Sequence, residues 1–387
     1  MEKNDLEVTR MSHFVGIGLV LGFLLPHFST ALLLVYPLLC LFYQCFKQNR
    51  IFYKNNLIVI IPIFFTLLIN VIQGVTTKSI LSCITILLYF FCFPIVGKVK
   101  IPNFYLYLIL SVILLSQLIY VFKISFLVDI MNKYYPISEK NIEYFRHMRN
   151  NISFDNYTHF RLGGLYRNPN QCARFVTFLL ASFLVLNNEK PIRKLLPFII
   201  VSFYSVLLTG SRTGFVVASM IIIAFLFVEK RLTPAWRYGI IFAAFVGFLY
   251  LSIADISSYR GLNVTSTGSS DYKFKTFAYY LSIENSSFRI MFGYLDSDKF
   301  ESTVDVLNFF DADYGYLIFQ FGFVGFIAVL SHFFSVYLRM DKIGRVFLVN
   351  LLWMITSTIV TSFQAFFVFM LLLSVIFNNN NLNNVRT

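Results

Sequence analysis

The stretch Phe104-Tyr-Leu-Tyr-Leu-Ile-Leu-Ser-Val-Ile-Leu-Leu-Ser-Gln-Leu-Ile-Tyr-Val-Phe122 contains no charged residue. A transmembrane helix needs about 20 mostly apolar residues to cross about 30 Å of hydrocarbon, so this stretch predicts one. Similar apolar runs recur along the chain, and we predict about twelve spans on the same length criterion. The predicted spans lie near 14–28, 29–46, 57–73, 79–97, 104–122, 172–187, 195–209, 214–228, 237–254, 314–337, 346–361 and 363–377.

The composition of the whole chain supports this reading. Of its 387 residues, 57% are hydrophobic and only 13% are charged. A soluble domain carries about 25% charged residues, and a disordered chain has low hydrophobicity, so both classes are excluded. We therefore predict an all-α polytopic membrane protein in which residues 1–387 form a single integral membrane domain.

The distribution of basic residues predicts the orientation in the membrane. The net charge is +13, which in a soluble protein would suggest a nucleic-acid partner. With the N-terminus placed in the cytoplasm, 17 of the 32 basic residues and 6 of the 19 acidic residues fall on the cytoplasmic side. Every short inner loop is then basic, as the positive-inside rule requires. We therefore expect both termini in the cytoplasm, and we expect no nucleic-acid partner.

Two long polar segments, 123–171 and 255–313, fall on the outer face in this orientation. Because they contain aromatic residues and no repeats, we predict folded caps rather than linkers. The tail 378–387 begins with four consecutive asparagines and is predicted to be disordered. The two halves of the chain show no internal repeat, which disfavours a transporter and favours chemistry on the outer face.

The first outer segment ends in Arg161-Leu-Gly-Gly-Leu-Tyr-Arg-Asn-Pro-Asn170. Gly163 and Gly164 permit a close approach of the backbone or a positive φ. Asn168, which precedes a proline, favours a turn, and Asn170 is placed to cap the helix that follows. The sequence therefore predicts a tight loop that leads directly into a helix N-terminus.

Arginines accompany two predicted helix N-termini on the outer face. Arg161 and Arg167 precede the sixth span, and the hairpin Thr209–Gly214 puts Ser211 and Arg212 at the start of the eighth. Helix N-termini and guanidinium groups both attract anions, so a phosphate or pyrophosphate is the ligand that this pattern favours. The alternative is that the arginines reach lipid headgroups and the polar residues only cap helices.

Two carboxylates and two phenols stand together before the tenth span. A carboxylate at Asp313, beside Tyr314 and Tyr316, could accept a proton from a sugar hydroxyl, whereas for Asp311 a helix cap is favoured. A capping role is the alternative for Asp313 as well. His159 is a second candidate base, although a solvated loop histidine is the simpler interpretation.

Taken together, these segments resemble the O-antigen polymerase and O-antigen ligase superfamily, over roughly residues 155–330. The matching residues are Arg161, Gly164, Asn168, Pro169, Asn170 and Ala173, then Thr209 to Gly214, then Asp313, Gly315, Tyr316 and Leu317 with Gly322 and Gly325. The resemblance implies a bacterial inner-membrane glycosyltransferase of the GT-C type whose active site faces the periplasm.

The same resemblance implies the substrates. Such enzymes use undecaprenyl-pyrophosphate-linked oligosaccharide: a polymerase transfers the growing glycan to an incoming lipid-linked repeat unit, and a ligase transfers it to lipid A-core. Family ligases carry a histidine where this chain has Asp313, which favours a polymerase. The family often has an arginine and a tryptophan in the preceding helix, where Lys273 or Lys275 and Phe277 stand here. The family also implies a chain-length regulator as a partner.

We expect no cofactor, because arginines held at helix ends can stabilise a pyrophosphate leaving group without a metal. Three other functions stay open. They are a ligase or related surface-polysaccharide transferase, a flippase or transporter, and a structural or sensor protein in which the three motifs are accidental. A transporter would place ionisable residues near the midplane, and the predicted spans hold almost none.

Overall fold

A computed structural model describes the chain in segments. They are residues 2–24, 35, 38–39, 54–72, 77–94, 99–122, 124–134, 162–166, 168–228, 287–294, 313–360 and 362–380. Within these segments the regular structure is helical throughout, and they contain no strand. Four helical segments are long and apolar enough to cross a membrane, as an all-α membrane protein requires. They are Lys54–Ile72, Asn103–Val121, Pro169–Leu186 and Asp313–Arg339.

The chain divides into two compact units, which we describe separately. Unit 1 comprises Met1–Gly22, Phe28–Pro102 and Thr267–Thr387, and unit 2 comprises Phe23–His27 and Asn103–Ser266. The single membrane domain and the count of twelve spans remain predictions. Predicted spans 29–46 and 237–254 fall outside the described residues, apart from positions 35, 38 and 39.

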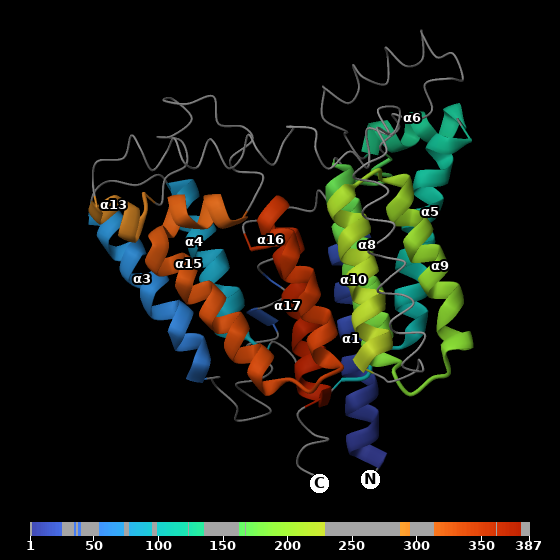
Figure 1. The fold of residues 1–387 in the computed structure, drawn as a ribbon, viewed down its shortest axis with the longest axis horizontal. Helices are drawn as coiled ribbons and strands as arrows, with labels where there is room; N and C mark the ends of the chain where they lie inside the picture. The colour runs from blue at the N-terminus through green and yellow to red at the C-terminus, as the bar shows by residue number, and fades with distance from the viewer. Residues whose placement is uncertain are drawn as a thin grey trace. The chain divides into compact units, whose positions relative to one another are not determined.

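Unit 2 is a bundle of apolar helices that pack side by side (Figure 1). Its long helices are α5 (Asn103–Val121), α8 (Pro169–Leu186), α9 (Ile192–Leu208) and α10 (Arg212–Val228), and the shorter α6 (Ser125–Tyr134) follows α5. The bundle therefore matches four of the predicted spans to within about three residues at each end, which is the usual uncertainty of such boundaries.

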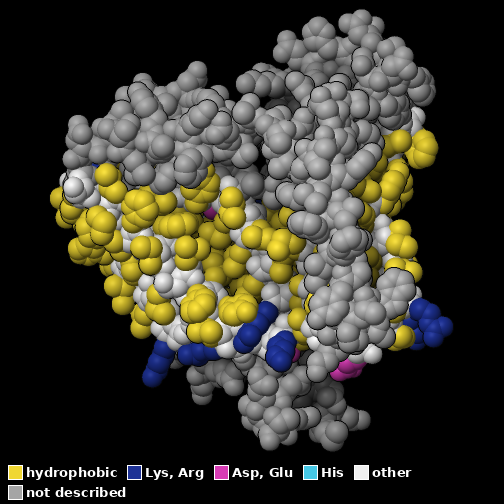
Figure 2. All heavy atoms as spheres, in the orientation of Figure 1, with side chains coloured by type: hydrophobic (Ala, Val, Ile, Leu, Met, Phe, Trp, Pro, Cys, Tyr) yellow, Lys and Arg dark blue, Asp and Glu magenta, His cyan; other side chains and the backbone are white. Residues whose placement is uncertain are grey.

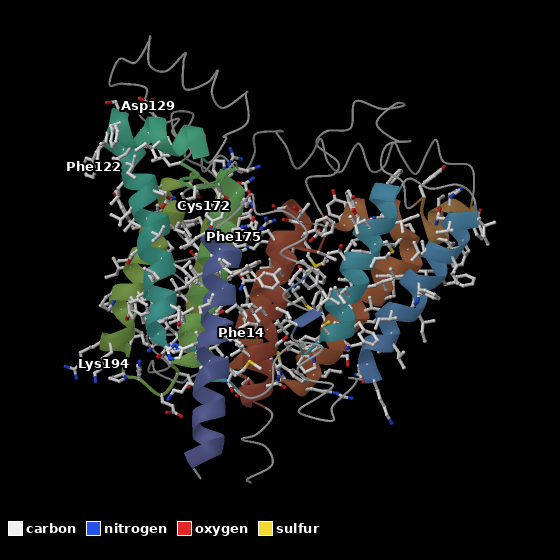
Figure 3. The ribbon with its side chains drawn as sticks, turned by 180° about the vertical axis from the view of Figure 1, so that it is seen from behind. Phe14, Phe122, Asp129, Cys172, Phe175 and Lys194 are labelled. Atoms are coloured by element: carbon white, nitrogen blue, oxygen red, sulfur yellow. The ribbon has the colours of Figure 1, made fainter. Side chains whose placement is uncertain are left out.

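Helix α8 forms the centre of unit 2. Every residue from Cys172 to Val185 is buried, so this helix contacts protein rather than lipid on all its faces. Figure 3 shows Asp129 and Lys194 at opposite ends of the bundle. At the Lys194 end, the amide side chains of Asn103 and Asn187 hydrogen-bond each other in both directions, at 2.8 and 2.9 Å. The opposite end is where α8 and α10 begin.

Unit 1 contains more and shorter elements. They are α1 (Glu2–Leu24), η2 (Lys54–Asn56), α3 (Leu57–Ile72), α4 (Thr77–Cys92), α13 (Ser287–Phe292), α15 (Asp313–Arg339), η5 (Gly344–Leu352), α16 (Trp353–Thr356) and α17 (Phe363–Asn380). Helix α3 packs along α15 and against α4, and α17 packs against α4 and η5. The last two residues of α1 belong to unit 2.

Basic residues gather at one end of the apolar surface of unit 1. Figure 2 shows hydrophobic side chains covering the visible face of this unit, with Lys and Arg along its lower edge. The short helix η2, directly before α3, meets the end of α15 there, because an Nη of Arg339 donates to Asn55 Oδ1 at 3.1 Å. A concentration of basic residues at one end of the helices is the feature from which the cytoplasmic side is predicted.

Helix α15 is broken in its first half. Gly322 has φ +68° and ψ −178°, so the backbone leaves the helical conformation there. The short helix α13 lies against this break, and Tyr294 N donates to the carbonyl of Phe319 at 2.9 Å. The predicted span 314–337 is therefore confirmed in position, but it consists of two helical pieces.

Four other boundaries differ from the sequence-based expectation, and one of them is the end of α4, which lies at Cys92 rather than near residue 97. Helix α1 begins at Glu2 rather than near residue 14, and the predicted span 346–361 forms the 3₁₀ helix η5 followed by one turn of α-helix. Helix α17 continues through Asn380, so the first residues of the predicted disordered tail are helical. Asn379 Nδ2 donates to the carbonyl of Val99 at 2.9 Å, which explains that extension.

Candidate functional site

The loop before α8 is a tight turn whose glycines are required by its geometry. Gly164 has φ +57°, and a Cβ there would collide with the hydroxyl of Ser116. A Cβ on Gly163 would lie 2.5 Å from the carbonyl oxygen of Tyr166, whose own N–H donates to Gly163 O at 3.0 Å. Both predicted reasons for the glycines, close approach and positive φ, are therefore confirmed.

Two consecutive residues of α5 hold this loop. Ser116 Oγ accepts from Leu165 N at 3.2 Å, and Gln117 Nε2 donates to the carbonyl of Leu162 at 3.1 Å. Gln117 also joins α9, because Nε2 donates to Ser205 O at 3.0 Å and Oε1 accepts from Ser205 Oγ at 2.6 Å. Sequence reasoning missed Gln117, although an amide inside an otherwise apolar run is a visible signal.

An aromatic anchor completes the loop. Tyr166 is buried, and its hydroxyl donates to the carbonyl of Phe23 at 2.7 Å. Its ring stacks on Phe175 with centroids 5.0 Å apart. Figure 3 shows Phe175 on α8, one turn beyond Cys172. The hydrogen bond and the ring stack of Tyr166 therefore fix the backbone that enters α8.

The N-cap of α8 lies two residues earlier than expected. Asn168, rather than Asn170, is the N-cap, and its side-chain oxygen accepts from Asn170 N at 2.8 Å. The helix begins at Pro169, because proline lacks an N–H and its fixed φ suits the first helical position. Asn170 therefore lies within the first turn, where it is half-buried.

The hairpin before α10 has the predicted arrangement. Gly210 has φ +58°, and Ser211 Oγ caps the helix by accepting from Gly214 N at 3.1 Å. Arg212 is the first residue of α10 and is half-buried. A Cβ on Gly214 would lie 2.6 Å from the Cβ of Ala173 on α8, so the two helices approach closely near their N-termini.

A buried arginine, which the sequence analysis did not single out, also lies here. Arg174 belongs to the first turns of α8, is only 2% exposed, and has its guanidinium carbon 5.6 Å from the ring centre of Phe175. An arginine inside an apolar span is costly and usually has a function. Its signal in the sequence was a single charge at the start of the predicted span 172–187.

Asp313, in unit 1, is placed differently from the sequence-based expectation. Its side chain is fully buried, and its Oδ2 accepts from the backbone N–H of Ile359 and, at 2.9 Å, from that of Val360. Its own N–H donates to Ser357 O at 3.1 Å. The carboxylate thus holds the extended connection between α16 and α17, whose N–H groups need an acceptor.

Some of the remaining predicted site residues lie in one unit or the other, and the rest lie outside the described residues. Tyr314 and Tyr316 are half-buried at the start of α15 in unit 1, whereas Asn168, Asn170, Ser211 and Arg212 belong to unit 2. Five predicted site residues lie outside the described residues. They are His159, Arg161, Arg167, Lys273 and Lys275.

A second arginine that the sequence analysis missed lies in unit 1, within the segment 255–313. Arg289 Nη1 donates to the side-chain oxygen of the buried Asn70 on α3 at 3.0 Å, and its guanidinium lies 4.7 Å from the ring centre of Tyr294. This arginine joins α13 to α3. Its sequence signal was an arginine within a short apolar hexapeptide.

Comparison with protein families, with curated proteins and with solved structures finds no match for this chain. The chemistry of the site therefore rests on its own residues. Across the segments that the structure describes, no group of three or more His, Cys, Asp or Glu is placed to hold a metal ion. What unit 2 offers is positive potential from two neighbouring helix N-termini, next to a rigid loop and an arginine.

Proposed function

We propose that this chain is a bacterial inner-membrane glycosyltransferase that polymerises lipid-linked O-antigen repeat units on the periplasmic face. One observation carries the proposal: α8 and α10 begin side by side, with Arg212 as the first residue of α10. Helix N-termini and guanidinium groups together favour a phosphate or pyrophosphate. A lipid pyrophosphate is the anion that a membrane-embedded site would meet, and the ordered motifs of the sequence favour the same substrate.

In the proposed reaction, a hydroxyl oxygen of the incoming repeat unit attacks the anomeric carbon of the growing glycan. The bond from that carbon to the pyrophosphate oxygen breaks, and undecaprenyl pyrophosphate leaves. Arg212 and Arg161 stabilise the negative charge that develops on the leaving group. The residues proposed to bind the rest of the lipid-linked substrates are His159, Arg167, Asn168, Asn170, Ser211, Lys273, Lys275, Tyr314 and Tyr316.

The proton of the attacking hydroxyl needs an acceptor. Because the Asp313 side chain is fully buried and its Oδ2 already accepts from two backbone N–H groups of segment 357–360, Asp313 can serve only if this segment moves away. His159 and an oxygen of the departing pyrophosphate are the other acceptors that we propose. The substitutions Asp313→Ala and Asp313→Asn separate these possibilities.

A transporter is the alternative that one observation favours, since broken helices form substrate sites in many transporters. Helix α15 is broken at Gly322. However, the backbone at this break is bonded to Tyr294 and packed by α13, which leaves the break occupied by the protein itself. We therefore propose the transferase.

The first test is deletion of the gene in its host. We expect surface lipid that carries a single repeat unit, because ligation to lipid A-core continues while polymerisation stops. A gel of surface polysaccharide measures this directly. A complete absence of repeat units on lipid A-core would instead indicate a ligase, and an unchanged ladder would contradict both activities.

The second test is Arg212→Ala. We expect a loss of about 10²-fold in the rate of polymer formation from lipid-linked repeat units, since removing one charge-stabilising donor typically has this effect. Arg212→Lys should restore little, because an ammonium lacks the planar two-donor geometry of a guanidinium.

The matched control is Lys194→Ala, which removes one exposed positive charge from the other end of the same unit (Figure 3). We expect normal polymer from this variant. Full activity of Arg212→Ala at equal protein abundance would contradict a pyrophosphate site at the start of α10.

A further inference from the structure

A buried polar cluster surrounds Gln117 in unit 2, next to the loop that enters α8. Gln117 is fully buried, in a helix whose other buried residues are mostly apolar. A glutamine offers two N–H donors and one carbonyl acceptor. Its Nε2 donates to the carbonyls of Leu162 and Ser205, its Oε1 accepts from Ser205 Oγ, and Cys172 Sγ lies 3.5 Å from Nε2.

These partners belong to both halves of the candidate site. Leu162 directly follows Arg161 and begins the turn that leads to the cap of α8. Ser205 lies in the last turn of α9, just before the hairpin that presents Arg212. A direct backbone bond also joins the same two halves, because Leu162 N donates to the carbonyl of Leu208 at 3.0 Å.

We propose that Gln117 is a positioning residue of the pyrophosphate site. By bonding Leu162 and Ser205 at once, it sets the distance between the loop 162–166 that enters α8 and the hairpin that carries Arg212. It does so without touching the substrate. This inference rests on the proposed function, since it names the residue that holds the loop before α8 and the hairpin before α10 in register.

The geometry makes the role specific to an amide. In a carboxylate of the same size, the oxygen that replaces Nε2 would face the carbonyls of Leu162 and Ser205, and both donated bonds would be lost. A leucine would keep the volume but leave those carbonyls without this donor. Misplacing a reacting group by about 1 Å can lower a rate by about 10²-fold, so small shifts of the loop are enough.

The test compares Gln117→Leu and Gln117→Glu with the unaltered protein in the same membranes or detergent. We expect kcat/KM for the lipid-linked donor to fall at least about tenfold, with a raised KM, in protein that elutes as a single species. Amide hydrogen exchange should accelerate in 162–166 and 209–214 and stay unchanged around Asn187 at the other end of the bundle.

Ser205→Ala keeps the inference testable if the Gln117 variants do not fold. It removes the hydroxyl that bonds Gln117 and should lower kcat/KM about threefold, as expected for one hydrogen bond. Its matched control is Ser182→Ala, because Ser182 is equally buried but bonds only the carbonyl of Phe178 in its own helix. We expect no change in KM from that control.

The outcomes distinguish this inference from the proposed function. If the unaltered protein forms no polymer, the proposed function fails, and hydrogen exchange alone decides whether Gln117 holds the two segments. If the unaltered protein polymerises and the Gln117 variants, or Ser205→Ala where those do not fold, keep its KM and its exchange pattern, the positioning role is overturned. A loss of stability with an unchanged KM would assign Gln117 a purely structural role, which also contradicts the inference.

Discussion

Gly322→Ala is expected to prevent the accumulation of folded protein. Gly322 combines φ +68° with ψ −178°, a conformation that residues with a side chain hardly adopt. An added Cβ would also collide with the carbonyl oxygen of Met291, which belongs to the backbone and cannot move away by a change of side-chain rotamer. The conformational strain alone costs about 1–3 kcal/mol, and the collision with the α13 backbone adds to it.

The measurement is the amount of monodisperse protein and its thermal midpoint after extraction into detergent. The matched control is Ile327→Ala on the same helix, where the side chain is 57% exposed and should tolerate truncation. Gly293→Ala should resemble Gly322→Ala, because Gly293 has φ +74° and its Cβ would collide with the carbonyl of Gln320. A Gly322→Ala protein with the thermal midpoint of the control would refute this account of the break.

Replacing Asp313 by alanine and by asparagine should have contrasting effects on the stability of the protein. Asp313→Ala leaves the N–H groups of Ile359 and Val360 without their acceptor, and each buried unsatisfied group costs about 1–3 kcal/mol. In Asp313→Asn the amide oxygen can replace Oδ2 for both donors, because both bonds end on the same oxygen. We therefore expect Ala to destabilise the protein strongly and Asn to destabilise it by only about 1 kcal/mol.

The polysaccharide ladder of the same variants tests the catalytic hypothesis for Asp313. A structural carboxylate predicts a near-normal ladder from Asp313→Asn, which is the result that the buried geometry favours. A general base predicts a loss of about 10²–10⁴-fold from the same variant at unchanged stability. Asp311→Asn, two residues earlier, serves as the matched control with the same change of charge.

The sequence alone predicted those helices whose ends coincide with the ends of an apolar run. Helix α5 lies within one residue of the predicted run 104–122, since hydrocarbon thickness sets the length of such a segment. The conformational need for Gly163 and Gly164 in the loop before α8 was also predictable, because positive φ and close approach leave few other residues.

Other features depend on partners that are distant in the chain. The acceptor role of Asp313 involves donors 46 and 47 residues away, and Gln117 bonds residues 45 and 88 positions away. The break at Gly322 occurs within a mostly apolar run, where hydropathy stays high on both sides. Local pattern carries no information about such contacts, because tertiary packing creates them.

The 3₁₀ helix η5 changes how far a short piece of chain can reach. A 3₁₀ helix rises about 2.0 Å per residue and an α-helix about 1.5 Å, so Gly344–Thr356 extends about 24 Å instead of about 20 Å. With three residues per turn, its side chains fall into straight columns. One column consists of Gly344, Phe347, Asn350 and Trp353, all buried, and Asn350 Nδ2 donates to Phe347 O along it at 2.9 Å. Inserting or deleting one residue in η5 would therefore rotate the part of the column beyond the change by a third of a turn and move Trp353 away from its buried position. We expect such a change to disrupt this segment more than substitution of a residue outside the column.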